Sequence, residues 1–431
     1  METILKEEIL DTLETNNQLR ETQHGFLPNK SCVTNILTFL EYTTRNIDDS
    51  SSVDAIYLDF SKAFDTVPHR RLLIKMGSLG IDTKTILWVE SWLKLRAQRV
   101  IIRGTKSEWR PVTSGVPQGS VLGPLLFLIY INDIDEGLTS KIIKFADDTK
   151  LYRRVVCRED QLQLQRDIDQ IHDWSNTWQM SFNPFKCKAL HFGKKNPCNT
   201  YTIAGESIEN VSQERDLGVL IRDDLDWDAH VAKVVSKANS VLGMIWRTYE
   251  CKSMKNIIQL YKTLVRPHLE YAVQAWRPYK QHHIDEIEKV QKRATRMITG
   301  FKELAYEERL KRTNLLSLEM RRSRADLIEV YKIMHGLYDI PRERFFTTSS
   351  TTTRGHSLKL YKGRSRLNVR KFFFSQRTIS EWNSLSEEVI SSGSVNEFKN
   401  KIDPLFKERR SNTISQRRLP APLSTASDCV V

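Results

Sequence analysis

Three aspartates of this chain each follow a run of apolar residues, and together their side chains could hold divalent cations. Asp59 follows the run 55–58, and Asp147 and Asp148 follow the run 142–146. A lone buried carboxylate costs roughly several kcal/mol unless a positive charge lies beside it. Three carboxylates that converge from separate strands suit a pair of metal ions about 3.5–4 Å apart. The pattern therefore predicts nucleotidyl transfer, in which a 3′-hydroxyl attacks a triphosphate.

Each of these aspartates also has a simpler interpretation. Adjacent residues of a regular strand point to opposite faces, so Asp147 and Asp148 reach one site only at the tip of a hairpin. Asp-Asp is also a common turn dipeptide, and Asp59 could cap a helix that follows its strand. The metal interpretation gains weight because both acidic positions follow strand-like runs in the same chain.

Further residues could contact a nucleotide. An aromatic ring at Phe64 beside the sugar would clash with a 2′-hydroxyl, although a core phenylalanine is the alternative. In the loop 114–120, Gln118 and Gly119 offer an amide and close backbone approach, but such sequences also form plain turns. Lys186 follows an Asn-Pro turn and could protonate a departing pyrophosphate, or lie on a solvated surface.

The elements that must position these residues follow from periodicity and turn signals. Two helical stretches flank the loop 23–28, and the first acidic strand follows at 55–60. Strands are expected at 98–102, 149–152, 180–192 and 201–221, and helices at 72–76, 85–95, from 122 onward and at 162–174. The composition changes to helices from Asp228, which places one boundary near 226–228 and another around Pro341 and the Ser/Thr run 347–353.

The net charge of +13 is spread unevenly. Residues 341–431 hold 17 Lys and Arg against 8 Asp and Glu, so +9 of it lies there. A basic excess favours phosphate-rich partners, although a solvated and partly disordered tail is an equal alternative. The longest apolar stretch, 121–131, is interrupted by Gly123 and Pro124, so no membrane span is expected. The six cysteines have no Cys-x-x-Cys spacing, which favours reduced thiols and an intracellular location.

Four segments in this order resemble a known family. They are DFSKAFD (59–65), SGVPQGSVLGP (114–124), FADD (145–148) and NPFK (183–186). The chain is similar to the reverse transcriptases of non-LTR (LINE-type) retrotransposons, in particular the jockey-like group. The similarity runs nearly end to end and includes the segments 264–271 and 354–357.

The resemblance implies a role for each candidate residue. Asp59, Asp147 and Asp148 would bind two Mg²⁺ ions (Mn²⁺ is a possible substitute), together with the backbone carbonyl of Phe60. Phe64 would be the sugar gate, Gln118 and Gly119 the nucleotide and template contacts, and Lys186 the general acid. Leu217 and Gly218 correspond to the family's primer-gripping hairpin.

The resemblance also implies an α+β right-hand polymerase fold. Residues 1–50 would be partial fingers, and 51–227 a palm with an antiparallel sheet and a fingers insertion at about 68–112. Residues 228–340 would be a helical thumb, and 341–431 a basic, partly disordered C-terminal region. The expected partners are an RNA template, a DNA primer or target, and dNTPs, with the nucleus as the site of action.

Three departures from the family pattern leave alternatives open. The finger motifs and the endonuclease that usually precede residue 1 are missing, so the chain resembles the C-terminal part of a longer element. The loop that usually carries Phe-Arg-Pro has Phe26, Leu27 and Pro28, and losing one charged contact costs about 1.5–3 kcal/mol. Besides an RNA-directed DNA polymerase, the chain could be a catalytically weak or inactive truncated copy that only binds RNA and DNA. An RNA-templated RNA polymerase is disfavoured only if the Phe64 ring reaches the sugar.

Overall fold

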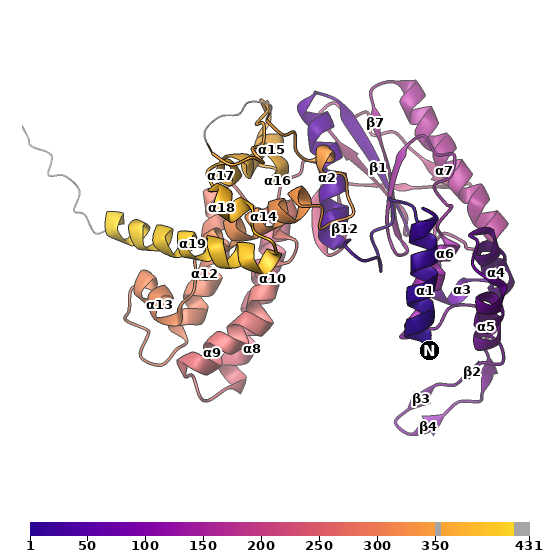
Figure 1. The fold of residues 1–431 in the computed structure, drawn as a ribbon, viewed down its shortest axis with the longest axis horizontal. Helices are drawn as coiled ribbons and strands as arrows, with labels where there is room; N and C mark the ends of the chain where they lie inside the picture. Colours follow the sequence, from indigo (N-terminus) through magenta and orange to yellow (C-terminus); the bar gives the residue numbers. More distant parts are fainter. Residues whose placement is uncertain (350–354, 418–431) are drawn as a thin grey trace, which may run out of the picture. The chain divides into compact units, whose positions relative to one another are not determined.

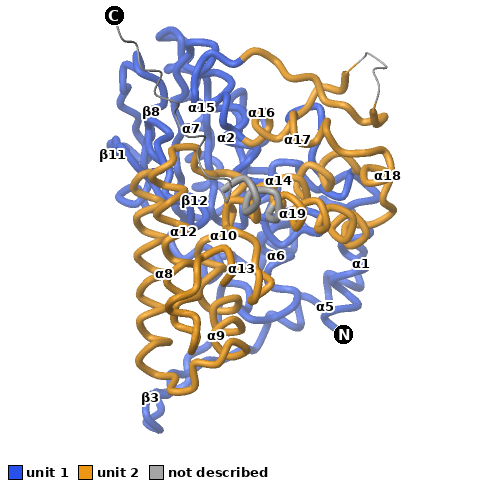
Figure 2. Tube along the Cα trace, turned by 90° about the vertical axis from the view of Figure 1, so that its left-hand side faces the viewer, with its two compact units in different colours: residues 1–227, 336–345, 365–373 blue, residues 228–335, 346–364, 374–431 orange. Residues whose placement is uncertain are grey.

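The chain folds into helices and one main sheet, and a computed structural model describes residues 1–349 and 355–417. The fold divides into two compact units, which Figure 2 colours separately. Unit 1 comprises residues 1–227, 336–345 and 365–373. Unit 2 comprises residues 228–335, 346–364 and the chain from 374 onward. The mixture of helix and sheet confirms the predicted α+β class, and the first division lies directly after Trp227.

A five-stranded sheet in the order β11–β8–β1–β7–β6 forms the centre of unit 1 (Figure 1). β1 (Ser52–Leu58) pairs antiparallel with both of its neighbours, β7 (Asp148–Val155) and β8 (Lys188–Phe192). β6 (Lys141–Phe145) pairs antiparallel with β7. β11 (Glu209–Val211), however, pairs parallel with β8, so the sheet is not purely antiparallel as predicted. The long connection 193–208 makes this possible, because a parallel neighbour needs a crossover rather than a tight turn.

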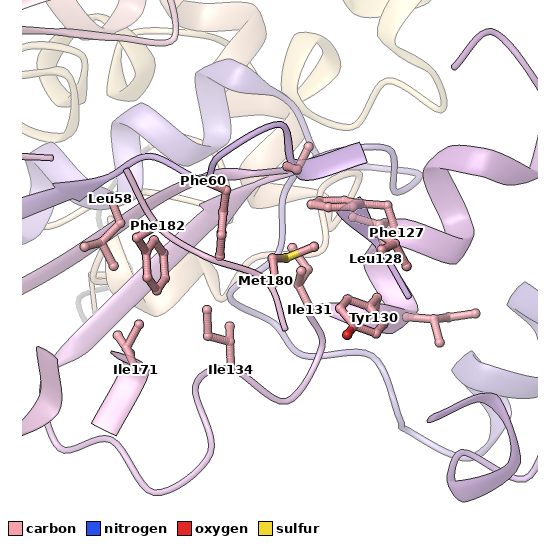
Figure 3. Close-up of a cluster of buried hydrophobic side chains, with 14 of the residues drawn as sticks. Leu58, Phe60, Phe127, Leu128, Tyr130, Ile131, Ile134, Ile171, Met180 and Phe182 are labelled. Carbon is pink, nitrogen blue, oxygen red and sulfur yellow. The ribbon is translucent and has the colours of Figure 1, made fainter. Parts of the chain in front are cut away.

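Both faces of β1 are buried, which explains why its sequence is almost continuously apolar. On one face lies α2 (Cys32–Asp48), where the Phe39 ring centroid is 6.4 Å from that of Tyr57. On the other face, Ile56 and Leu58 belong to a hydrophobic cluster with Leu164 and other residues of α7 (Arg158–Trp178). Figure 3 shows part of this cluster, including the neighbouring rings of Phe60 and Phe182. This packing holds β1, and the aspartate that follows it, in a fixed position.

The remaining helices of unit 1 lie at its N-terminus and around the insertion. Asp82 is the N-cap of α5 (Thr83–Leu93), and its carboxylate accepts hydrogen bonds from the backbone N–H groups of Lys84 and Thr85. These helices are α1 (Glu2–Thr15), α3 (Ala63–Thr66), α4 (His69–Ser78), α5 (Thr83–Leu93) and α6 (Leu122–Tyr130).

The single strand predicted at 98–102 is two short strands. β2 (Ala97–Gln98) pairs with β5 (Arg110–Pro111), and β3 (Ile101–Ile102) pairs with β4 (Thr105–Lys106). Between them, the Val100 N–H donates to the Ser107 hydroxyl at 2.9 Å instead of to a backbone carbonyl. A side chain therefore replaces one ladder partner and interrupts the strand. Two other hairpins complete unit 1: β9 (Thr202–Ile203) with β10 (Glu206–Ser207), and β12 (Gln213–Asp216) with β13 (Val219–Arg222).

Two segments from the C-terminal region belong to unit 1. They contain the 3₁₀ turn η2 (Arg342–Arg344) and α15 (Asn368–Lys371). The Arg370 guanidinium donates to both carboxylate oxygens of Glu41 on α2, at 2.9 and 2.7 Å. The expected C-terminal region 341–431 is thus divided between the units. Its predicted disorder concerns residues that include 350–354 and 418–431, which lie outside the described residues.

Unit 2 is helical in its described part. The carboxylate of Asp326 on α14 accepts from Arg277 and Arg377, so one buried acid connects three segments. Among the residues that the structure describes, no helix is long and apolar enough to cross a membrane. The helices are α8 (Asp228–Thr248), α9 (Met254–Leu260), the π-helix η1 (Tyr261–Val265), α10 (Arg266–Glu270), α11 (Val273–Trp276), α12 (Gln281–Arg296), α13 (Tyr306–Thr313), α14 (Leu318–Met334), α16 (Phe374–Arg377), α17 (Ile379–Asn383), α18 (Glu387–Ile390) and α19 (Val395–Arg417).

Candidate active site

Asp59 lies directly after the central strand β1, where the chain leaves the sheet. Its backbone carbonyl accepts from the Asn183 N–H at 2.8 Å, and the Ser61 N–H donates to the Ser181 carbonyl at 2.9 Å. Successive peptide groups of an extended chain point to opposite edges. The carbonyl of Phe60, between these two bonds, therefore points away from 181–183 and toward the side of β7.

Asp147 and Asp148 lie at the tip of the β6–β7 hairpin. Phe145 pairs with Asp148, so Ala146 and Asp147 form a two-residue turn. Ala146 has φ +54°, a left-handed conformation that costs a residue with a side chain roughly 1–2 kcal/mol. The sharp turn allows neighbouring carboxylates to approach one site, as the sequence predicted for a hairpin tip.

The hairpin tip lies beside Asp59. β1 and β7 pair antiparallel with Leu58 opposite Thr149, so Asp59 and Asp148 are the next residues on the two chains. Partial burial first and then the charge of Asp59 raise the pKa of the Asp147 carboxyl. Partial burial, the charge of Asp147 and that of Asp216 raise the pKa of the Asp148 carboxyl to about 6. Burial and the neighbouring carboxylates thus disfavour the charged forms of Asp147 and Asp148, and a bound cation would favour those forms.

These residues fit a divalent metal site. Asp59 Oδ1 has almost no exposed surface and no hydrogen-bond partner among the described residues. Carboxylates and a main-chain carbonyl are the hard oxygen ligands that Mg²⁺ and Mn²⁺ prefer. Asp59, Asp147 and Asp148 would supply three such side chains, and Phe60 would supply the carbonyl.

Lys186 lies beside this acidic group and pairs with Asp59. Its Nζ lies 3.4 Å from Asp59 Oδ1, and its side chain is 64% exposed. The turn that carries Lys186 is fixed by its own N–H, which donates to the Asn183 carbonyl at 3.0 Å. Asn183 in turn bonds to Asp59, so the lysine and the aspartate are positioned through one short chain of hydrogen bonds.

The loop 114–120 is held against the segment that follows Asp59. The Ser114 hydroxyl donates to the Asp65 carbonyl at 2.9 Å, and Gln118 Nε2 donates to the Asp65 carboxylate at 3.0 Å. A Cβ on Gly115 would lie 2.7 Å from the Asp65 backbone, so only glycine fits there. Gly119, by contrast, has φ +88° and open space where a Cβ would be. Gln118 and Gly119 are exposed, and Gln118 is already engaged with Asp65.

Phe64 is half-buried near this loop. Its ring stacks on that of Phe127 with centroids 4.3 Å apart. The exposed Phe26 ring meets it edge-on at 6.2 Å. Phe64 thus packs against the core on one side and is partly exposed on the other. Its role as a sugar gate stays a prediction.

Leu217 and Gly218 form the turn of the β12–β13 hairpin. Both have positive φ, +44° and +91°, as in the type I′ turns that fit a two-residue hairpin. The preceding residue, Asp216, is buried and accepts from Lys150 Nζ at 2.8 and 2.7 Å. Lys150 is on β7, two residues after Asp148, so a buried ion pair ties this turn to the acidic hairpin.

Comparison with known proteins decides the family. A family model described as reverse transcriptase (RNA-dependent DNA polymerase) matches residues 1–244, more than half of the chain. The chain belongs to the reverse transcriptase family. This confirms the resemblance read from the four motifs, all of which lie within the matched residues.

Several relatives of this reverse transcriptase chain come from mobile elements. The RNA-directed DNA polymerase from mobile element jockey of Drosophila funebris is 26% identical over 313 residues, covering 70% of this chain and 34% of the relative. The probable RNA-directed DNA polymerase from transposon X-element of Drosophila melanogaster is 26% identical over 310 residues, covering 69% and 34%. The chain therefore spans about a third of the length of these relatives. Among solved structures, apo telomerase from Candida tropicalis aligns with a TM-score of 0.43 and 11% identity, over 73% of this chain and 53% of that chain.

The segment 23–25 holds the acidic hairpin of this reverse transcriptase chain, a role that its sequence does not indicate. Gln23 Oε1 accepts from the N–H groups of Gly25 and Ala146, at 2.7 and 3.0 Å. The His24 N–H donates to the Lys144 carbonyl at 2.8 Å. A Cβ on Gly25 would lie only 2.3 Å from the Ala146 nitrogen. The glutamine-to-glycine spacing before the loop was visible, but nothing local in it indicates a partner more than 100 residues away.

The carboxylates of Asp59, Asp147 and Asp148 do not all come within 4.8 Å of one another. Among the described residues, one group of three possible metal ligands is that close, and it lies in unit 2. It comprises Asp228, His282 and His283. His283 Nε2 is 2.6 Å and Lys280 Nζ is 3.2 Å from the same Asp228 oxygen. The lysine already supplies the positive charge there, so this group does not add a metal centre to the reverse transcriptase site.

Proposed function

We propose that this chain forms the polymerase part of an RNA-directed DNA polymerase, which adds dNTPs to a primer 3′-OH on an RNA template. The observation that carries the proposal is the convergence of Asp59 with the Asp147–Asp148 hairpin tip. The printed names of the jockey and X-element relatives, RNA-directed DNA polymerases, support the same activity.

Reverse transcriptases in general use divalent metal ions, and two Mg²⁺ ions are proposed here, with Mn²⁺ as a substitute. The carboxylates of Asp59, Asp147 and Asp148 and the Phe60 carbonyl would hold them. When bound, the ions would supply charge stabilisation for the attacking hydroxyl and for the leaving pyrophosphate. The packed strand and the two-residue hairpin fix the backbone positions of these carboxylates, and their side chains would turn toward the ions.

The other candidate residues have proposed roles around this acidic group. Lys186 would give a proton to the departing pyrophosphate, since its ammonium lies 3.4 Å from Asp59 and reaches solvent. Phe64 would exclude a 2′-hydroxyl. Gln118 and Gly119 would contact the nucleotide and template, and Leu217 and Gly218 the primer end.

The proposal extends to partners and to the parts of the molecule. The chain would act on element RNA, a DNA primer or target, and dNTPs, at a nuclear site of action. Residues 1–50 and about 68–112 would serve as fingers, the rest of 51–227 as palm, and 228–340 as thumb. The segment 341–431 would add positive charge for phosphates, with strong salt dependence.

A binding-only role is the second candidate, and the loop 26–28 favours it. Leu27 stands where the family usually has arginine, and Phe26 beside it is 49% exposed. The triphosphate therefore loses a charge-assisted contact there, at a cost of about 1.5–3 kcal/mol.

Primer extension on an RNA template with Mg²⁺ and dNTPs tests the proposal. We expect the wild type to extend the primer, and Asp147→Asn to lower the rate at least about 100-fold, the effect of removing a key electrostatic group. Asp173→Asn, an exposed site on α7, is the matched control and should extend normally. Extension that survives Asp147→Asn contradicts the metal assignment. Wild-type binding of the hybrid without extension would favour the binding-only role.

A further inference from the structure

The segment 94–112 of unit 1 projects from the fold as a narrow ribbon, here called the basic ribbon. It contains the β2–β5 and β3–β4 pairs, and Figure 1 shows it extending beyond α5, away from the main sheet. From 100 to 111 every residue is exposed. An isolated two-stranded ribbon has no hydrophobic core of its own and is only marginally stable in water. Its apolar side chains therefore remain exposed to solvent.

The basic ribbon combines exposed apolar side chains with positive charge. Five large apolar side chains of the ribbon are more than half exposed: Leu95 (104%), Val100 (61%), Ile101 (56%), Ile102 (66%) and Trp109 (59%). Exposed apolar groups gathered in one place indicate an interaction surface. The same 19 residues carry six Lys and Arg against one Glu, a net charge of +5: Lys94, Arg96, Arg99, Arg103, Lys106, Arg110 and Glu108.

Trp109 provides a platform for an aromatic partner. The Arg99 guanidinium lies over its ring, 4.5 Å from the centroid. A planar cation on one face of an indole leaves the other face for stacking, and base–aromatic stacking contributes about 1–3 kcal/mol per base. A duplex offers phosphates but keeps its bases stacked on each other, whereas an unpaired strand offers both groups.

The base of the basic ribbon continues directly into the loop 114–120, which carries the candidate residue Gln118. The Val112 N–H donates to the Arg96 carbonyl at 2.8 Å, which closes the base, and Gly115 follows three residues later. Gly115 packs on the Asp65 backbone, and its carbonyl lies 2.8 Å from His69 Nε2. At no more than about 3.5 Å per residue, Pro111 is within about 14 Å of Gly115. A strand bound along the ribbon therefore leads to the loop that carries Gln118.

We propose that the basic ribbon binds the single-stranded RNA template ahead of the site, through phosphates on its Arg and Lys residues and base stacking on Trp109. The inference rests on the proposed function, which makes RNA the template. It assigns a partner to residues that the chemistry itself does not use. A protein surface would match the apolar side chains but not the density of positive charge.

Fluorescence anisotropy with two RNA–DNA hybrids tests this, one blunt and one with a 5′ RNA overhang of about ten nucleotides, the scale of a single-strand site. The wild type should bind the overhang hybrid more tightly. Trp109→Ala should lose roughly 5- to 150-fold of that gain, with the salt dependence unchanged. Arg103→Ala/Lys106→Ala should lower the slope of log affinity against log salt by about 1.4, at about 0.7 per single-strand phosphate contact. Neither variant should alter binding of the blunt hybrid.

Lys194→Ala/Lys195→Ala removes the same charge from another exposed segment of unit 1 and should leave the overhang gain intact. The inference is overturned if the ribbon variants keep the full gain, if blunt binding falls equally, or if a DNA overhang alone gives the gain. It is also overturned if sedimentation shows that these variants lose self-association rather than RNA binding. No step uses dNTPs, so a ribbon effect in a wild type that fails to extend would contradict the proposed function only.

Discussion

Gly25 lies against the backbone of Ala146, and this contact helps to position the acidic hairpin. A Cβ at Gly25 would come within 2.3 Å of the Ala146 nitrogen and 3.0 Å of the Phe145 carbonyl carbon. Real structures do not hold such contacts, so the hairpin would have to move. The accuracy of the carboxylate site thus depends on a residue with no functional group.

Gly25→Ala should therefore lower both stability and primer extension. We expect a loss of about 1–3 kcal/mol in the free energy of unfolding, as for other overpacked sites, and slower extension because Asp147 shifts. Urea unfolding and single-turnover extension measure the two effects. Gly77→Ala is the control, because it lies on α4 with its nearest neighbour at 3.8 Å, and it should be neutral or stabilising. A Gly25→Ala protein with unchanged activity would show that the contact does not position the hairpin.

His24, in the same segment, makes stability depend on pH. Burial first, and then the charges of Lys30, Lys150 and Arg344, lower its pKa to about 3. Below pH 6.5 the unfolded chain gains a proton here while the folded chain does not. The folded state therefore loses about 1.4 kcal/mol per pH unit as the pH falls from about 6.5 toward 3.

His24→Gln removes this titration and should flatten the acid dependence by that amount. Urea unfolding of wild type and variant at pH 7.5, 6, 5 and 4, roughly spanning the histidine range, gives the difference in slope. Equal slopes for the two proteins would mean that His24 is protonated in the folded state.

At the scale of elements, β7 and β12 are joined by a buried ion pair behind the acidic hairpin. The Lys150 and Asp216 side chains are each 3% exposed, and Lys150 Nζ also donates to Asn35 Oδ1 at 2.6 Å. The pair connects the hairpin that carries Asp148 with the hairpin that carries Leu217 and Gly218. It is a positioning contact rather than part of the chemistry.

Lys150→Met should leave Asp216 buried without its cation. The expected cost is about 3–5 kcal/mol in the free energy of unfolding. The double variant Lys150→Met/Asp216→Leu removes both charges and should recover most of that stability, measured by urea unfolding. Single and double variants that are equally destabilised would contradict a paired, buried charge.

The elements and the central carboxylates could be predicted from the sequence, because their signals are local. Apolar runs that end in aspartate mark β1 and the β6–β7 hairpin, and the register of the antiparallel pair then brings the carboxylates together. The contacts that hold the hairpin could not be predicted. Lys150 meets Asp216 from 66 residues away, and Gln23 meets Ala146 from 123 residues away. A single lysine within a strand and a glutamine in a loop give no local sign of either partner.

At the scale of the whole molecule, the chain passes through residues 228–335 of unit 2 and then returns to unit 1 at 336–345 and 365–373. Glu41 and Arg370 are 329 residues apart, and their side chains are 2% and 7% exposed. The sequence distinguished residues 341–431 by their positive charge and their Ser/Thr content. Neither property indicates that Arg370 pairs with Glu41. Truncation near 340 would therefore remove part of unit 1 itself.

Arg370→Met should lower the stability of unit 1 by about 1.5–3 kcal/mol, because Glu41 would lose its bidentate partner. The loss stays below that of a fully unpaired buried charge, because Arg45 Nη2 remains 2.9 Å from Glu41 Oε1. Thermal unfolding followed by circular dichroism measures the change. Lys371→Ala, an exposed neighbour on α15, removes the same charge and should have little effect. If both variants unfold at the same temperature as the wild type, residues 365–373 do not stabilise unit 1.

The most direct test of the central claim is electron paramagnetic resonance of Mn²⁺ bound to the protein with a template–primer and dNTP analogue. We predict a spin-coupled pair of ions, as expected for two metals about 3.5–4 Å apart. Asp59→Asn and Asp147→Asn should each abolish the coupled signal, while Asp173→Asn should keep it. A coupled pair that persists in Asp59→Asn or in Asp147→Asn would contradict a shared site.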